Sequence, residues 1–336
     1  MASITTILLT LLAVIASSEA TDHLFQKPAS LNVFKRGIYT PVRVDTSISP
    51  KSLVIFSPKE AGVYPILFFV HGFDIPNYEY TELFNFTASH GIIVVAPMLF
   101  TYFGIIPIIP SQQQEIDDAA DVANWLALNI NTAKPNILPE QVTANFDMFA
   151  MSGHSRGGKT AFALVLGYTK KTTLNVKVSA LLAVDPVAGN KVGFVERRSK
   201  PYVLTKEANS LNISVPTTII GTGVGTSCTP KGLSHAQFYK ECVQASYFVI
   251  SNYGHCDMLN DNNPLASLLR TMCGSGKRGT YDIMRRTLGG IMVAFIDAYF
   301  GGSPAVFNEI LSNPSLAPTK LHPVDEKGLS QQYYDA

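Results

Sequence analysis

The sequence lacks any long run of lysine or arginine, and its 26 basic side chains are balanced by 25 acidic ones, for a formal net charge of +1. Nucleic-acid-binding domains usually carry a basic patch or stripe, so the composition argues against nucleic acid as a partner. Although 46% of the residues are hydrophobic, no stretch approaches the roughly 20 apolar residues that span a bilayer. The composition therefore predicts an apolar chain that is not integral to a membrane.

Cysteine is scarce, and the four residues all lie in the C-terminal third of the chain: Cys228, Cys242, Cys256 and Cys273. No Cys-x-x-Cys spacing occurs, so neither a zinc site nor a thioredoxin-like motif is indicated. Four cysteines allow three pairings, and in a secretory compartment we expect at least one disulfide bridge. The alternative is that all four are ordinary small, buried residues.

The N-terminus contains an apolar run over residues 7–15, followed by Ser18 and Ala20, which suit a signal-peptidase site. We expect residues 1–20 to be a cleaved secretory signal, with a chloroplast transit peptide as the alternative, although no basic residue precedes Lys27. Two glycosylation acceptor patterns, at Asn85 and Asn212, are compatible with secretion. We expect residues 21–336 to form a single domain, with residues 21–50 as a polar leader onto it.

Apolar strand patterns alternate with helical patterns along most of the chain, and internal repeats and low-complexity tracts are absent. The predicted strands cover residues 52–56, 65–70, 91–96, 146–151, 178–184, 216–220 and 246–250, and the predicted helices cover residues 112–128, 158–167 and about 280–299. Such alternation predicts an α/β fold with a mainly parallel central sheet and helices on both faces.

Residues 153–157 read Gly-His-Ser-Arg-Gly, directly after the predicted strand 146–151 and directly before the predicted helix 158–167. A serine on a sharp turn between strand and helix is lifted out of the sheet, and its flanking glycines allow a close backbone approach. This order predicts a nucleophile elbow with Ser155 at its tip. The pentapeptide alone is weak, so its weight depends on partners elsewhere in the chain.

A serine hydroxyl needs a histidine base that is itself oriented by a carboxylate, and in α/β-hydrolases the chain order is serine, acid, histidine. Asp185 directly follows the predicted strand 178–184, at its C-terminal end, where an open α/β sheet places its functional groups. A helix N-cap is the alternative role for this aspartate. His255 follows the predicted strand 246–250 and is the expected base, whereas we expect His235 to be a surface residue.

The segment His71-Gly72-Phe73 follows the predicted strand 65–70, at the position that supplies an oxyanion-hole amide. We therefore expect the main-chain N–H groups of Phe73 and Arg156 to stabilise the tetrahedral adduct. Residues 99–110 are apolar and interrupted by glycine and proline. We expect Tyr102 and Phe103 in this segment to line an apolar substrate site or to contact a lipid surface, with core packing as the alternative.

These segments together resemble the plant chlorophyllases. The similarity covers residues 153–164, 69–73, 183–187 and 254–257, and extends from about Lys35 to the last predicted helix. It implies an α/β-hydrolase fold and places that family's catalytic triad on Ser155, Asp185 and His255. The same three residues follow from chain order alone.

The resemblance also implies hydrolysis of the phytyl ester of chlorophyll, which yields chlorophyllide and phytol. Because the magnesium belongs to the substrate, the resemblance implies no protein metal site. We also expect no cofactor and no obligate protein partner. One alternative is a general lipase or carboxylesterase that acts on another apolar ester. A second is a binding protein that keeps a hydrolase fold without activity, although such proteins often lose a member of the triad.

Overall fold

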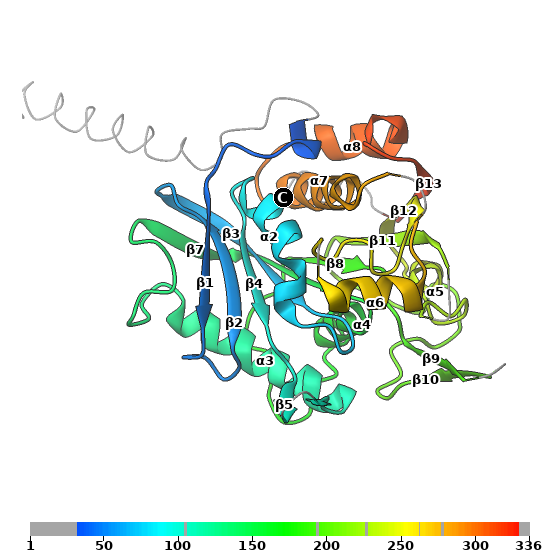
Figure 1. Cartoon of the computed structure of the whole chain (residues 1–336), viewed down its shortest axis with the longest axis horizontal. Coiled ribbons are helices and arrows are strands. Elements are labelled where there is room, and N and C mark those ends of the chain that lie inside the picture. Colours follow the sequence, from blue (N-terminus) through cyan, green and yellow to red (C-terminus); the bar gives the residue numbers. More distant parts are fainter. Residues whose placement is uncertain are drawn as a thin grey trace, which may run out of the picture.

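The computed structural model describes residues 32–328 apart from 104–105, 193–194, 226–227, 262 and 277–278. Within these residues, one nine-stranded sheet forms the centre of the molecule, in the order β1-β2-β4-β3-β7-β8-β11-β12-β13 (Figure 1). Its strands are β1 (Pro41–Thr46), β2 (Leu53–Pro58), β3 (Gly62–Val70), β4 (Ile93–Pro97), β7 (Val142–His154), β8 (Ala180–Val184), β11 (Thr217–Val224), β12 (Ala245–Gly254) and β13 (Leu321–Lys327).

The sheet is mainly parallel, as predicted. Each neighbouring pair from β4 to β12 runs parallel, while β1, β2 and β13 join antiparallel at the two edges. In the register of β7 and β8, His154 lies opposite Val184. The residues that follow these two strands, Ser155 and Asp185, therefore leave the same edge of the sheet side by side.

Helices cover both faces of the sheet (Figure 1). They are α2 (Thr81–Ala88), α3 (Gln112–Asn129), α4 (Arg156–Val165), α5 (His235–Glu241), α6 (Pro264–Cys273), α7 (Tyr281–Tyr299) and α8 (Ala305–Ser312), with short 3₁₀ turns η1 (Asn32–Phe34), η2 (Asn77–Tyr80) and η3 (Pro314–Leu316). Alternate residues of β3 face opposite sides. Phe68 packs in the core beneath α3 and α4, and Phe69 packs in the core beneath α2 and α7. This two-sided burial is what the predicted α/β-hydrolase fold requires.

The prediction that residues 21–50 form a leader is wrong for its described part. Residues 41–46 form β1, which pairs antiparallel with β2 at the edge of the sheet. Only Val42 and Val44 alternate with polar residues in this strand, so its pattern is too short to distinguish it from a polar connection. At the other edge, β13 contains Pro323 and few apolar residues, which fits an edge strand and hides it from pattern reading.

Two short hairpins project from the sheet. One pairs β5 (Thr101–Phe103) with β6 (Ile106–Ile108), and the other pairs β9 (Gly189–Val192) with β10 (Val195–Arg198). The first lies in the apolar segment 99–110. None of the helices in the described part of the chain is long and apolar enough to cross a membrane.

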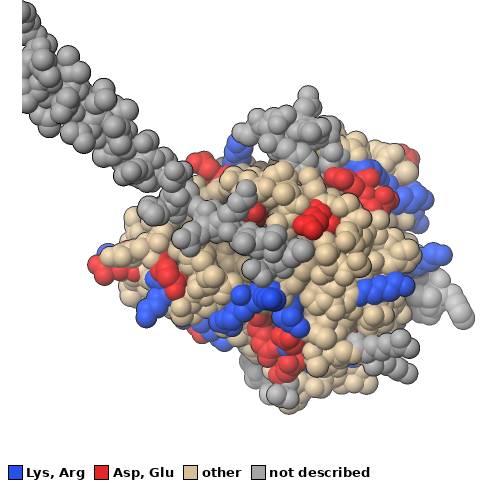
Figure 2. Space-filling model, turned by 90° about the horizontal axis from the view of Figure 1, so that it is seen from above, with Lys and Arg blue, Asp and Glu red and all other residues tan. Residues whose placement is uncertain are grey.

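Acidic and basic side chains lie intermixed on the face shown in Figure 2, without one large basic patch. The two glycosylation acceptor patterns differ in accessibility. Asn212 and Ser214 are exposed, whereas Thr87 of the other pattern is fully buried in α2. The folded chain therefore has room for a glycan at Asn212, whereas the pattern at Asn85 is partly buried.

Candidate active site

The turn at Ser155 is tight because main chains meet there without intervening side chains. Ser155 has φ 56° and ψ −121° between the end of β7 and the start of α4, a conformation that L-residues rarely adopt. A Cβ atom on Gly153 would lie 2.3 Å from the carbonyl oxygen of Gly157, and one on Gly157 would lie 2.2 Å from that of Val70. Gly153 is therefore needed for β7 to approach the start of α4, and Gly157 for α4 to approach the end of β3.

Three predicted side chains meet at the carboxyl edge of the sheet. Ser155 Oγ lies 2.8 Å from His255 Nε2, and His255 Nδ1 lies 2.8 Å from Asp185 Oδ2. Asp185 follows β8 and His255 follows β12, and all three side chains are buried. The geometry matches a nucleophile, a base and a carboxylate that orients the base.

Asp185 is held as a carboxylate. Its burial favours the neutral form, but the hydrogen bond and charge of His255, the charge of His235 and the Thr222 hydroxyl outweigh burial and lower the pKa of Asp185 to about 2. Thr222 Oγ1 on β11 donates a 2.6 Å hydrogen bond to Asp185 Oδ2. Two donors on one oxygen fix the direction in which the carboxylate faces His255.

The expectation that His235 is a surface residue is wrong. Its side chain is only 12% exposed, and its Nε2 atom lies 3.7 Å from Asp185 Oδ1. His235 begins α5, and its ring fits beside β11 because Gly221 has no side chain: a Cβ there would lie 2.2 Å from His235 Nδ1. A glycine inside a strand often marks such a close approach, and that glycine is the sequence signal that could have indicated this contact.

The two amides expected to form the oxyanion hole remain available. Neither the N–H of Phe73 nor that of Arg156 donates a hydrogen bond within the described residues. Arg156 is the first residue of α4, where an amide has no partner inside the helix. A helix N-terminus also favours developing negative charge. Both residues border the same pocket as Ser155.

The side chain of Arg156 holds the surroundings of that amide. Its Nε atom donates a 2.6 Å hydrogen bond to buried Glu115 on α3, and its Nη2 atom donates one of 2.7 Å to the Pro110 carbonyl. The guanidinium carbon lies 5.5 Å from the centroid of the Phe73 ring. Arg156 therefore connects α4, α3, the base of the β5–β6 hairpin and the Phe73 loop.

His71 is buried and its ring joins two loops. Its Nδ1 atom donates to the Gly72 carbonyl at 2.8 Å, and its Nε2 atom accepts from the Leu99 amide at 2.9 Å. Burial, with a smaller contribution from the charge of Arg156, lowers the pKa of His71 to about 4 despite its bond to Gly72. The imidazole is therefore neutral, in the tautomer that both contacts require.

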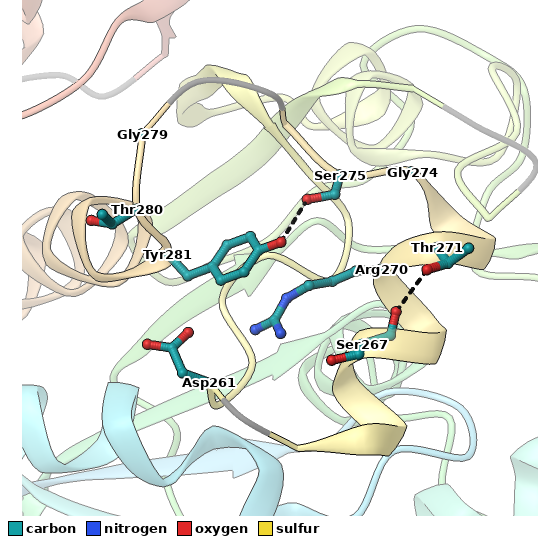
Figure 3. A pocket seen from close by; sticks show the side chains of 9 residues that line it. All are labelled: Asp261, Ser267, Arg270, Thr271, Gly274, Ser275, Gly279, Thr280 and Tyr281. Atoms are coloured by element: carbon teal, nitrogen blue, oxygen red, sulfur yellow. Dashed lines mark hydrogen bonds between the residues drawn. The ribbon is translucent and has the colours of Figure 1, made fainter.

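The loop that carries His255 is fastened by side chains that the sequence did not reveal. Asp257 accepts hydrogen bonds from the amides of Gly254 and Gly276, each at 2.7 Å. Arg270 reaches from α6 toward Asp261 and Tyr281 (Figure 3). Its Nη2 atom donates to the carbonyls of Leu259 and Asn260, and its guanidinium stacks 3.9 Å from the centroid of the Tyr281 ring. A hollow of about 740 Å³ borders this stack.

The pocket at Ser155 has a volume of about 510 Å³. Its lining residues are Phe73, Asp74, Ile75, Gln112, Ser155, Arg156, Val187, Gly189, Asn190, Arg198, Ser199, Cys228, His255, Cys256, Leu269, Met272 and Cys273. Cys228 and Cys273 form a disulfide in its wall, with their Cα atoms 5.3 Å apart, so one of the pairings left open by the sequence is present. Cys242 and Cys256 are buried thiols, and burial raises the pKa of each to about 12.

The structure does not bring Tyr102 into the wall of this pocket. Tyr102 lies on β5, is largely exposed, and its ring centroid is 5.4 Å from that of Phe100. The side chain of Phe103 lies outside the described part of the structure. Among the described residues, no group of three histidine, cysteine, aspartate or glutamate side chains could hold a metal ion.

The fold and this arrangement of serine, histidine and carboxylate are those of an α/β-hydrolase. A family model described as Chlorophyllase matches residues 29–328. The chain is 48% identical to the Chlorophyllase type 0 of Chenopodium album over 89% of this chain and 87% of that protein. It is 39% identical to the Chlorophyllase-1 of Arabidopsis thaliana over 85% of this chain and 87% of that protein.

A third relative, the protein named Chlorophyllase-1, chloroplastic, of Citrus unshiu, is 39% identical over 88% of this chain and 89% of that protein. With a family model that covers most of the sequence, these similarities place the chain in the chlorophyllase family. It is accordingly a carboxylic ester hydrolase of the chlorophyllase type, as the resemblance implied.

Proposed function

We propose that this chain hydrolyses the phytyl ester of chlorophyll, with Ser155 as nucleophile, His255 as base and Asp185 as the residue that orients the base. One observation carries the proposal: His255 lies 2.8 Å from Ser155 Oγ on one side and 2.8 Å from Asp185 on the other. Membership of the chlorophyllase family supports the choice of substrate.

In the first half of the reaction, Ser155 Oγ attacks the ester carbonyl while His255 Nε2 takes its proton. The tetrahedral oxyanion accepts hydrogen bonds from the amides of Phe73 and Arg156. His255 then protonates the departing phytol oxygen, which leaves an acyl-enzyme on Ser155. Water, deprotonated by His255, then attacks the acyl carbon. The bond to Ser155 Oγ breaks as His255 returns the proton to that oxygen, and chlorophyllide leaves.

Asp185 determines which nitrogen of His255 carries the proton. Because the pKa of Asp185 is about 2, its carboxylate is ionised at neutral pH and accepts the hydrogen bond from His255 Nδ1. The unprotonated Nε2 then faces Ser155, as a base must. The same carboxylate stabilises the imidazolium that forms when the proton moves.

The role of Ser155 is tested with Ser155→Ala and with a matched control, Ser152→Ala. Ser152 lies three residues earlier, on β7, and its buried hydroxyl has no hydrogen-bond partner among the described residues. We expect Ser155→Ala to lower kcat on chlorophyll by at least 10³-fold with an unchanged melting temperature, and Ser152→Ala to keep full activity. A fully active Ser155→Ala protein refutes the mechanism.

The substrate is tested separately, because the same machinery would serve a general lipase or carboxylesterase. Purified protein is offered chlorophyll and a short p-nitrophenyl ester at equal concentration. We expect kcat/KM for chlorophyll to exceed that for the short ester by at least tenfold. Turnover of the short ester alone supports the general esterase and rejects the pigment substrate.

We further propose that the rim of the pocket contacts a lipid surface, where an apolar pigment is held. The β5–β6 hairpin exposes Ile106 (63%) and Ile108 (54%), and Met272 (62%) is exposed on α6 at the pocket wall. Tyr102 on the same hairpin and Phe73 at the pocket are also exposed. Large apolar side chains that gather on a surface favour lipid or protein contact, and the bond from Arg156 to Pro110 ties this hairpin to the active site.

Sedimentation with phosphatidylcholine vesicles tests this contact. We expect the double variant Ile106→Ser, Ile108→Ser to bind vesicles at least threefold less than the parent protein while its turnover of the short ester is unchanged. Leu128→Ser is the matched control, because Leu128 is 79% exposed but lies at the far end of α3, about 24 Å along the helix from Gln112 at the pocket. Equal binding by all three proteins contradicts the proposal.

For the N-terminus we propose that residues 1–20 direct the chain into the secretory pathway, with import into the chloroplast as the alternative. These residues lie outside the described part of the structure. The apolar run and the residues that suit a signal-peptidase site support the first destination, and the printed name of the Citrus unshiu relative supports the second. A fluorescent protein that carries residues 1–30 at its N-terminus distinguishes the endoplasmic reticulum from the plastid in leaf cells.

A further inference from the structure

His154, the residue before Ser155, lies inside the molecule and does not line the pocket. It is the last residue of β7, its side chain is fully buried, and its ring packs against that of His255 with the centroids 4.5 Å apart. The mechanism above gives this imidazole no task. It nevertheless adjoins the nucleophile in the chain and contacts the ring and main chain of the base.

Two hydrogen bonds connect His154 to other parts of the site. Its Nδ1 atom lies 2.8 Å from the Tyr80 hydroxyl, and its Nε2 atom lies 2.9 Å from the main-chain carbonyl of His255. Because a carbonyl only accepts, Nε2 carries the proton. Tyr80 therefore donates its own proton to Nδ1, while its oxygen accepts the 3.0 Å hydrogen bond from the Gly72 amide.

This chain of bonds joins the three loops on which the reaction depends. Gly72 precedes Phe73 of the expected oxyanion hole, His154 precedes Ser155, and the final acceptor is the main chain of His255 itself. All of its members lie within the buried interior. Each bond also fixes the direction of the next, so that removal of one leaves a buried polar group without its partner.

His154 serves this role as a neutral ring. Burial first, and the neighbouring charge of His255 second, lower its pKa to about 3, against smaller opposite effects from Asp185 and the bond to the His255 carbonyl. At neutral pH, therefore, no positive charge on His154 opposes the imidazolium that His255 forms during the reaction.

We propose that His154 and Tyr80 are positioning residues: by holding the carbonyl of His255 and the amide of Gly72, they keep the base and the oxyanion hole in register with Ser155. This role rests on the proposed function, because it presumes that His255 is the base. It concerns the rate of the chemical step and not the binding of substrate.

The asymmetry of the imidazole gives a matched pair of variants. In His154→Gln the side-chain amide extends to the position of Nε2, so it still donates to the His255 carbonyl. In His154→Asn the amide extends only to the position of Nδ1 and loses that bond. We expect His154→Gln to keep at least a third of the parent kcat and His154→Asn to lose at least tenfold, with KM within twofold for both.

Tyr80→Phe tests the other end of the chain by removing a single oxygen atom. We expect a five- to twentyfold lower kcat with an unchanged KM. Tyr64→Phe is the control: its hydroxyl is also hydrogen bonded, at 2.9 Å to the Glu60 carbonyl, but it lies near the start of β3, about 20 Å along the strand from Val70. We expect Tyr64→Phe to keep the parent kcat.

The rates of the His154, Tyr80 and Tyr64 variants are measured on the short ester and on chlorophyll, and are divided by the amount of protein that reacts with a fluorophosphonate, so that misfolded protein does not count. Ser155→Ala cannot react with this probe, so its rate is divided by the total amount of folded protein. The positioning role is refuted if His154→Asn, His154→Gln and Tyr80→Phe all retain the parent kcat. It is also refuted if kcat falls equally in His154→Asn and His154→Gln. Ser155→Ala is measured alongside: its inactivity keeps the proposed function intact in that case, whereas its full activity removes both proposals.

Discussion

The two sides of the active site are held in place by different kinds of contact. On the side of Ser155, main chains touch directly, because Gly153 and Gly157 have no side chains to keep them apart. On the side of His255, the loop is fastened by hydrogen bonds that the Asp257 carboxylate accepts and that the Arg270 guanidinium donates. The nucleophile is therefore fixed by shape and the base by charged donors and acceptors, so each side should fail in its own way.

The largest expected loss of stability is caused by acid, through the buried histidines. Burial lowers the pKa values of His71, His90 and His154 to about 4, 4 and 3, below the value of about 6.5 in an unfolded chain. At a pH between the native and the unfolded pKa values, the unfolded chain binds protons that the native chain does not. The free energy of unfolding is therefore highest above pH 6.5 and decreases as the pH falls. Each histidine contributes about 2 kcal/mol of loss between pH 7 and pH 5.

Urea unfolding at pH 7, 6 and 5 measures this loss. We expect a total decrease of about 6 kcal/mol in the free energy of unfolding, of which about 4 kcal/mol comes from His71 and His154 beside Ser155. The His90→Gln protein should lose about 2 kcal/mol less than the parent. A free energy of unfolding that stays constant over this range contradicts the assignment of these histidines as buried and neutral. Asp185, with a pKa of about 2, contributes its loss only in stronger acid.

A methyl group added at Gly157 disrupts the Ser155 side of the active site, where main chains are in direct contact. In Gly157→Ala the new Cβ would meet the carbonyl oxygens of Val70 and His71 at 2.2 and 2.4 Å, and backbone atoms cannot move aside easily. We expect a loss of about 3 kcal/mol in the free energy of unfolding, measured with urea. Gly225→Ala is the control, because no atom lies within 4 Å of its added Cβ, and it should stay within about 0.5 kcal/mol.

Loss of a planar donor breaks the side that is fixed by charge. Arg270→Lys keeps the positive charge but removes both the stacking on Tyr281 and one of the two bonds to Leu259 and Asn260. We expect a loss of about 2 kcal/mol in stability and a lower kcat, because the His255 loop is no longer held. A protein with parent stability and parent kcat would show that this fastening has no effect.

The smallest expected effect concerns the carboxylate between the two sides. Thr222→Val removes the hydroxyl that donates to Asp185 Oδ2 at 2.6 Å and keeps the shape of the side chain. We expect about 1 kcal/mol lower stability and about a fivefold lower kcat at pH 7, from one hydrogen bond to a charged group. An unchanged kcat would mean that His255 alone orients Asp185.

The same division explains what the sequence could predict. Strand, turn and helix around Ser155 are consecutive residues, so the pattern revealed the elbow directly. Asp185 and His255 followed from chain order, because parallel strands place their carboxyl ends at one edge. The contact of His235 with Asp185 could not be read in this way, because it depends on Gly221 in a separate strand.

Long-range pairings were also beyond pattern reading. The disulfide between Cys228 and Cys273 joins residues 45 positions apart, and the spacing of four cysteines does not specify their partners. Arg270 and Asp257 are polar residues whose partners are main-chain atoms of the His255 loop, so their role in holding that loop could not be predicted, although Asp257 lies in the segment 254–257. At the edge of the sheet, β1 has too few apolar positions to distinguish it from a polar connection.

His255 activates Ser155, and this activation can be measured by the reaction of the intact protein with a fluorophosphonate. We expect mass spectrometry to find one adduct per chain, located on Ser155, and to find it formed at least 10³-fold more slowly in His255→Ala. An adduct on another residue, or none on Ser155 in a protein that still hydrolyses chlorophyll, would contradict the account.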